Sequence, residues 1–213
     1  MKSRLLDLFE DETLRVRIQK KLPRLFQMAE IESKRGGGTG MEVGNLREKI
    51  LIALLIHKFG EKNVDAGVST TAPGVDTRLF GDPVGIKTIT VRAIRSSGGV
   101  KVSWTVDPQK ARQFAENYAP TCDTLLAQIV WNGKGGLFLL PIEAQQEILG
   151  AMGRDKFLKL PKPGTNPRGV EWSPDALRQL LHHPETRSIE IFWESSQIEY
   201  NPYRRWVDYW QEE

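Results

Sequence analysis

The sequence predicts a mixed α/β fold in which one apolar helix precedes a run of short antiparallel strands, a crossover helix and two buried strands. Three observations predict it. The most apolar helical segment, 45–59, stops at a glycine, the residue that most readily ends a helix. Short β-rich runs separated by turn residues follow over 63–106. Beyond a helix at about 107–118, the runs 125–131 and 136–140 are almost wholly apolar, as expected of strands covered on both faces.

The N-terminal segment, 3–33, carries apolar residues at helical spacing. Pro23 lacks the backbone donor that a helix interior needs, so the segment is predicted to form two or three helices that cap the sheet. The glycines between Arg35 and Met41 cannot support a helix and predict a hinge or contact loop. The antiparallel strands are expected at 63–70, 75–80, 84–94 and 100–106, with turns at 81–83 and 97–99.

The crossover helix has a well-defined start. Asp107 can cap the first backbone amides, and Pro108 suits the first helical position. Its apolar residues recur at i, i+3, i+4 and i+7, which favours a helix that packs on the sheet and connects two parallel strands. Further helices are predicted at 141–152 and from Ser173, with a last strand at 188–194.

Composition limits the function classes. The 213 residues are 39% hydrophobic and 27% charged with a net charge of +3, which is ordinary for a single soluble domain and permits nucleic-acid binding. The longest apolar run, 50–56, is too short to cross a bilayer, so no membrane contact is expected. A lone Cys122 excludes an internal disulfide and fits a reducing compartment, so a cytoplasmic location is expected.

An acid and a lysine lie on two adjacent predicted strands. Asp76 follows Val75 at the start of the first strand, and Lys87 interrupts the apolar run of the second. A carboxylate that holds a divalent cation beside a lysine that steadies an attacking water suffices to cleave a phosphodiester. The alternative is an aspartate that closes a Pro-Gly turn and a lysine that points into solvent.

With this order of elements, the chain resembles the PD-(D/E)XK nuclease superfamily over residues 41–141, and within it the type II restriction endonucleases, ThaI-like enzymes included. The resemblance implies an αβββαβ core, a mixed sheet flanked by helices, in which an aspartate and an acid-x-lysine motif hold one or two Mg²⁺ ions and orient a water. Asp76 and Lys87 match the first and last positions of this motif. Gly85 stands where the family usually has the acid.

Glu48 is the best candidate for the missing carboxylate. On its helix it shares a face with Leu51, Ile52 and Leu55, so it is expected to point toward the sheet. Alternatively, Asn45 and Glu48 form a capping box that satisfies backbone amides. Asp82 is typical of a turn residue but could also ligate the metal, and two weaker candidates are Glu42 and Glu116.

We therefore expect a single nuclease domain over 1–213, with a helical cap and glycine-rich loop at 1–40, the catalytic core at 41–141, and additions for specificity and dimerisation at 142–213. The predicted enzyme is a site-specific, Mg²⁺-dependent homodimer that cuts double-stranded DNA and leaves 5′-phosphates. Two loops are candidates for contacting DNA, and the alternative for both is a plain surface connection; their candidate residues are Arg35, Met41, Lys162, Asn166 and Arg168.

Two other functions stay open on the sequence alone. One is a structure-selective or repair nuclease of the same fold. The other is a DNA-binding module that has lost catalysis, which the glycine at position 85 suggests. The aromatic C-terminal tail could stack on bases, although tryptophans at this density more often complete a core or a dimer interface.

Overall fold

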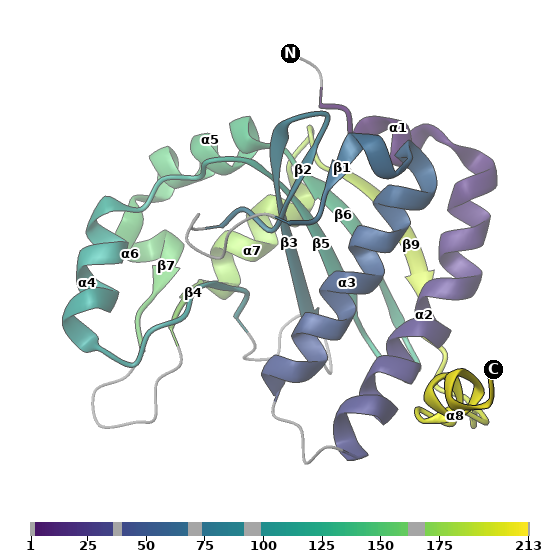
Figure 1. Cartoon of the computed structure of the whole chain (residues 1–213). Helices are drawn as coiled ribbons and strands as arrows, with labels where there is room; N and C mark the ends of the chain where they lie inside the picture. The colour runs from purple at the N-terminus through teal and green to yellow at the C-terminus, as the bar shows by residue number, and fades with distance from the viewer. Residues whose placement is uncertain (1–2, 36–39, 68–73, 92–98, 162–168, 213) are drawn as a thin grey trace.

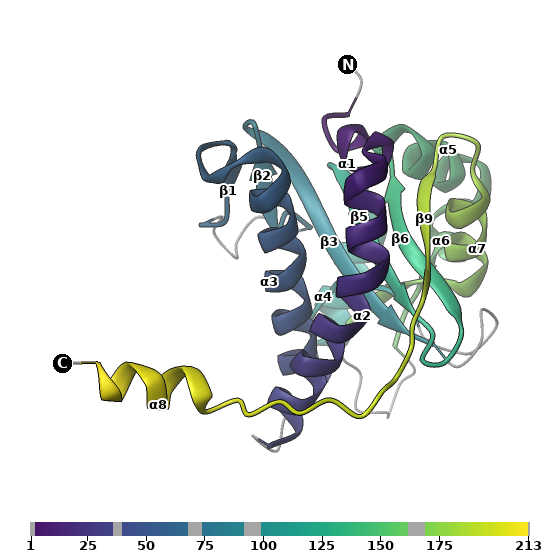
Figure 2. The same cartoon turned by 90° about the vertical axis from the view of Figure 1, so that its right-hand side faces the viewer.

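The computed structural model describes residues 3–35, 40–67, 74–91, 99–161 and 169–212. Its centre is a six-stranded mixed sheet with helices on both faces (Figures 1 and 2). The strands lie in the order β1 (Val64–Asp65), β2 (Thr77–Leu79), β3 (Asp82–Thr90), β5 (Asp123–Ile129), β6 (Lys134–Leu140) and β9 (Arg187–Phe192). The helices are α1 (Leu6–Glu10), α2 (Glu12–Arg35), α3 (Gly40–Phe59), α4 (Pro108–Asn117), α5 (Ile142–Met152), α6 (Arg154–Phe157), α7 (Pro174–His182) and α8 (Arg204–Gln211), and the 3₁₀ turn η1 spans Glu61–Asn63.

One pair of neighbouring strands, β3 and β5, is parallel, and the other neighbours in this sheet are antiparallel. The helix between the parallel strands is α4, and Asp107 caps it by accepting hydrogen bonds from the amides of Gln109 and Lys110. The predicted crossover and its cap are therefore confirmed. The two strands after it are also confirmed as buried strands, with Leu125 and Leu137 fully inaccessible to solvent.

The predicted four-stranded meander was wrong in one respect. The segment expected at 100–106 forms β4 (Lys101–Ser103), which leaves the main sheet and joins a separate three-stranded sheet with β8 (Val170–Trp172) and β7 (Leu158–Lys159). Burial explains this departure, because Val100 packs with the side chains around Trp172 and Phe157 on the far side of the main sheet.

The predicted interruption at Pro23 was also wrong, because α2 continues through it. Leu14, Ile18, Leu22 and Phe26 lie on one face of the helix at spacings of four residues, and all are buried. Continuous packing of this stripe outweighs the hydrogen bond that the proline cannot donate. Likewise α3 begins at Gly40, five residues before the predicted start at Asn45.

Two apolar clusters lie on opposite faces of the main sheet. The first joins α1, α2 and α3 to the sheet, and Trp193 is buried within it against Phe26 and Trp131. The second lies under α4, α5, α6 and α7. None of the helices within the described ranges is long and apolar enough to span a bilayer. The β2–β3 hairpin therefore belongs to a sheet that is packed on both faces.

Replacing Pro23 with alanine is predicted to stabilise the protein. An interior proline costs a helix about 3 kcal/mol relative to alanine, whereas truncating the buried ring of Pro23 gives up only about 1–2 kcal/mol of apolar burial, so the free energy of unfolding should rise by about 1–2 kcal/mol. Urea denaturation measures the change. Pro174→Ala is the matched control, because Pro174 occupies the first turn of α7, where proline is favourable. An equal gain in both variants would show that position within the helix does not matter.

Candidate active site

A tight hairpin places the predicted acid and lysine. The two residues between β2 and β3, Phe80 and Gly81, both have positive φ, at 51° and 89°, which is the geometry of a type I′ turn. Their neighbours pair directly, Leu79 with Asp82 and Thr77 with Val84. The turn therefore lies before Asp82, and the prediction that residues 81–83 form it was wrong by one residue.

Asp76 and Lys87 meet where β2 begins. Lys87 Nζ lies 2.8 Å from Asp76 Oδ2, and the two side chains are only 19% and 21% exposed. The same carboxylate oxygen accepts a hydrogen bond of 2.6 Å from the amide of Ile86. The amide of Asp76 in turn donates to the carbonyl of Val84 at 2.9 Å. The prediction that these residues lie side by side is confirmed, and a solvent-facing lysine is excluded.

Glu48 belongs to the same charge cluster. Because α3 begins at Gly40, Asn45 lies inside the helix, so the two residues cannot form a capping box. Glu48 is half-buried on the face of Leu51 and Leu55. Burial raises the pKa of the Glu48 carboxyl, and the charge of Asp76 raises this pKa further, whereas the charge of Lys87 lowers it. Both active-site charges therefore act on Glu48 through space.

The backbone explains the glycine at position 85. A Cβ atom there would lie 2.8 Å from the carbonyl oxygen of Gly74, 3.2 Å from Thr124 Oγ1 and 3.5 Å from Cys122 Sγ. The first distance is closer than a carbon atom tolerates, and the neighbour is backbone that cannot rotate away. An acid therefore does not fit at this position without a shift of the chain.

Sequence reasoning missed the polar residues on this side of the sheet. Gln145 is almost fully buried, and its Nε2 donates to the carbonyls of Cys122 and Leu140 and to Thr124 Oγ1. It helps line a cavity of about 290 Å³ that reaches Lys87. The available signal was a glutamine one residue from Ala144 and three from Ile148, on the apolar face of the predicted helix. Cys122 is a buried core residue, as expected.

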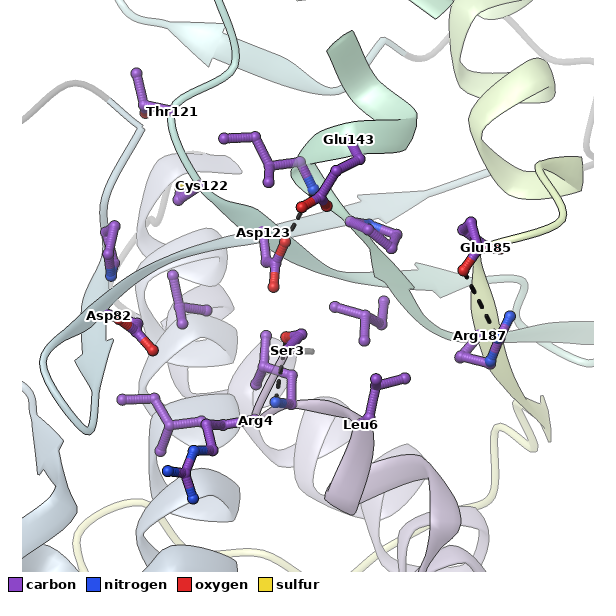
Figure 3. Close-up of a pocket in the computed structure, with 17 residues that line it drawn as sticks. Ser3, Arg4, Leu6, Asp82, Thr121, Cys122, Asp123, Glu143, Glu185 and Arg187 are labelled. Carbon is purple, nitrogen blue, oxygen red and sulfur yellow. Dashed lines mark hydrogen bonds and ion pairs between the residues drawn. The ribbon is translucent and has the colours of Figure 1, made fainter. Parts of the chain in front are cut away.

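Asp82 lies at the other end of the hairpin. Its side chain lines a separate cavity of about 670 Å³, together with Asp123 and Glu143 (Figure 3). Asp82 and Lys87 are five positions apart along β3, so their Cα atoms are separated by about 16 Å. The structure thus places Asp82 in a different cavity from the one that reaches Lys87, and its role as a metal ligand stays a prediction that this placement does not favour. The two weaker candidates, Glu42 and Glu116, are both exposed.

The predicted DNA-contacting residues are only partly described. Arg35 is the last residue of α2, and Met41 lies in the first turn of α3, so both belong to helices rather than to a loop tip. Lys162, Asn166 and Arg168 lie outside the described residues. The roles of all five stay predictions.

The fold and site together define a nuclease of the PD-(D/E)XK type, in which a hairpin acid and lysine face a helix carboxylate. The sequence matches the family model "Restriction endonuclease ThaI" over residues 8–212. A solved structure described as "Restriction endonuclease in complex with substrate DNA" is 49% identical, with a TM-score of 0.88 over 98% of this chain and 99% of that one. No curated protein matches the chain. The chain belongs to the ThaI restriction endonuclease family and is a type II site-specific nuclease.

Restoring the family acid at position 85 is predicted to harm the protein. Gly85→Ala and Gly85→Asp should each lower the free energy of unfolding by roughly 1–3 kcal/mol, because either Cβ presses on the carbonyl of Gly74. Urea denaturation measures the loss, and the alanine variant separates the steric effect from the added charge. Faster DNA cleavage by Gly85→Asp would contradict the steric reason for the glycine.

Glu48→Gln is predicted to stabilise the protein at neutral pH in the presence of a chelator. The pKa of Glu48 in the folded protein lies above its ordinary value of 4.5. As the pH rises from 4.5 to the folded-state pKa, the carboxyl ionises less readily in the folded chain than in the unfolded chain, so the free energy of unfolding falls. Above the folded-state pKa, the ionised carboxylate keeps this destabilising effect. The neutral glutamine removes this cost. Urea denaturation across a pH series should show a gain at pH 7 that vanishes below pH 4.5. Glu116→Gln, which makes the same change at an exposed side chain, controls for the loss of one charge.

Proposed function

We propose that the protein is a Mg²⁺-dependent homodimer that cuts both strands of a specific double-stranded DNA sequence and leaves 5′-phosphates. Asp76, Glu48 and Lys87 carry the catalysis. The observation that supports this proposal is the 2.8 Å contact between Lys87 and Asp76, within the field of Glu48. Membership of a restriction endonuclease family favours this function over the repair-nuclease and inactive-module alternatives.

The donor set suits a hard divalent cation. Asp76 and Glu48 are two carboxylates of which one raises the pKa of the other, so a bound cation would relieve their repulsion. Oxygen donors of this kind are what Mg²⁺ prefers, and these two side chains would hold it. When bound, the ion would polarise the scissile phosphate and lower the pKa of a coordinated water.

The chain's own groups have distinct tasks. The amide of Ile86 fixes the carboxylate of Asp76, so its position does not depend on side-chain rotation alone. Lys87 has three N–H donors, of which one points at Asp76. The remaining donors can hold an attacking water and offset the charge that develops on the phosphate. Burial among apolar neighbours strengthens these electrostatic effects.

A single chain provides one such centre, whereas a double-strand cut needs two. A two-fold dimer would place one centre on each strand and would read the two halves of a palindrome. Residues 1–40 and 142–213 would then provide the cap, the specificity loops and the dimer contacts around the core at 41–141. Arg35, Met41, Lys162, Asn166 and Arg168 are our candidates for contacting the DNA.

Three substitutions are predicted to abolish cleavage without unfolding the protein. Asp76→Asn, Glu48→Gln and Lys87→Ala should each slow cutting of phage DNA by at least about a hundredfold, since each removes a group that binds the cation or the developing charge. Gel analysis of time courses in Mg²⁺ measures the rate.

Asp82→Asn and Glu116→Gln are matched carboxylate controls and should cut at the wild-type rate. End-labelling of the products should find a phosphate on the new 5′ end and a free hydroxyl on the new 3′ end at each break. Undiminished cleavage by the Asp76 or Lys87 variant, or equal cleavage in chelator, would overturn the assignment.

A further inference from the structure

The three-stranded sheet of β4, β8 and β7 lies next to the active site. Figure 1 shows it on the α4 side of the main sheet. Val100 and Val170, on its inward face, are buried in the apolar cluster under α4 to α7. Val102 of β4 and the proposed catalytic lysine, Lys87, line the same cavity of about 290 Å³. A DNA duplex extends well beyond one phosphate in both directions, so this sheet is among the first surfaces that a duplex bound at Lys87 would meet.

The outward face of this sheet carries two lysines without a counter-ion. Lys101 of β4 pairs in register with Glu171 of β8, and Glu171 pairs with Lys159 of β7. Residues that oppose one another on adjacent strands share a face, so the three form a row in which the two lysines are about 10 Å apart. The Glu171 side chain lies against Gly99. Within the described ranges, neither lysine forms an ion pair.

Two apolar side chains at the end of β4 extend this row. Trp104 and Val106 are 52% and 74% exposed. Lys101 Nζ lies 4.2 Å from the centroid of the Trp104 ring, a cation–π contact that holds the ammonium group over one face of the indole. We call Lys101, Trp104, Val106 and Lys159 the small-sheet surface.

The segment that carries Trp104 and Val106 has a fixed conformation. The amide of Asp107 donates to Thr105 Oγ1 at 3.1 Å, and the Asp107 carboxylate caps α4. Thr105 and Asp107 are half-buried, whereas the residues that alternate with them are exposed. The outward side chains are therefore held in place before any partner arrives, which lowers the entropic cost of binding.

Charge distinguishes the small-sheet surface from the aromatic helix α8. Trp206 on α8 also lies beside a cation, with Arg205 Cζ 4.8 Å from its ring centroid. That arginine, however, pairs with Glu32 at 2.7 Å, so phosphate binding there would require breaking an ion pair. The lysines of the small-sheet surface have no such pair to break, and free lysines beside a sheet at the active site suit the phosphates of DNA.

We propose that one strand of the bound DNA lies along the small-sheet surface, with Lys101 and Lys159 on phosphates and Trp104 packed on the sugars beside them. This inference rests on the proposed function and names a surface that carries the DNA past the catalytic centre. Phosphate contacts fix the register of a duplex without reading its sequence. The small-sheet surface would therefore position the scissile bond relative to Lys87.

The first test removes one lysine at a time from the full-length protein. Lys101→Met and Lys159→Met are compared with Lys134→Met, which removes an exposed lysine of β6 that pairs with Glu190 at 3.0 Å. Binding to a labelled mixed-sequence duplex is measured by fluorescence anisotropy in a chelator, over a series of salt concentrations. Each small-sheet variant should reduce the slope of log affinity against log salt by about 0.9, because one fewer counterion is released. Lys134→Met should keep the wild-type slope.

The second test removes the indole. Trp104→Ala should weaken binding to the same duplex by about tenfold, because the variant loses an apolar contact that is half-exposed in the free protein. The matched control is Trp206→Ala, which removes a tryptophan of similar exposure that also lies beside a cation and should bind as the wild type does. Light scattering and the melting temperature should be the same for all variants.

An unchanged salt slope in either small-sheet lysine variant overturns the inference, as does an equal loss of binding in the controls. A change of particle mass in Trp104→Ala with unchanged DNA binding would assign the surface to a contact between chains and equally overturns it. If the variants bind DNA as expected while the wild type does not cut phage DNA in Mg²⁺, the small-sheet surface stands and the proposed function fails.

Discussion

The site depends on the short length of β2. Its pairing with β3 ends at Thr77 and Val84, so the edge of β3 beyond this point offers backbone amides with no strand of the described residues beside them. The Asp76 carboxylate accepts a hydrogen bond from one of these amides, that of Ile86. The next residue of the strand, Lys87, supplies the ammonium group that neutralises this carboxylate. The acid is thus fixed by the backbone of the strand that carries its partner. A longer β2 would pair with this edge and leave no room for a side chain there.

The third charge comes from a helix, so the geometry of the site also depends on how α3 sits against the sheet. Arg47, the neighbour of Glu48 in the sequence, holds α3 in place against the sheet. It is buried, pairs with Glu30 of α2 at 2.5 Å and donates to Thr90 of β3 at 2.9 Å. Trp131 donates to the same carboxylate at 2.9 Å. Burial lowers the pKa of Arg47, and the charge of Glu30 opposes that shift. The network joins α2, α3 and the end of β3 beside the active site.

The sequence predicts those parts of the fold whose causes are local. The cap at Asp107, the apolar strands and the carboxylate on the inward face of α3 all follow from spacing and side-chain chemistry, and the structure has all three. The continuation of α2 through Pro23 was not predictable locally, because the packing that outweighs the lost hydrogen bond comes from the sheet. The departure of β4 into a second sheet depends on contacts with β8, some seventy residues away. In the site, Asp76 and Lys87 followed from the hairpin pattern, whereas the polar pocket around Gln145 required knowing which strand lies beside Gly85.

In the site that we propose, the second acid comes from α3 instead of β3, and this changes how the site affects the stability of the fold. A carboxylate at position 85 would share a strand with Lys87, and its distance to the lysine would be set by the strand alone. A carboxylate on α3 instead must approach Asp76 from a separate layer of the fold, and the raised pKa of Glu48 reflects burial beside a like charge. That unfavourable interaction exists only while α3 is held close, so the buried contacts of Arg47 must overcome it. The same packing that brings Glu48 into the site thus opposes its ionisation, and a cation bound between the two carboxylates would turn this repulsion into affinity.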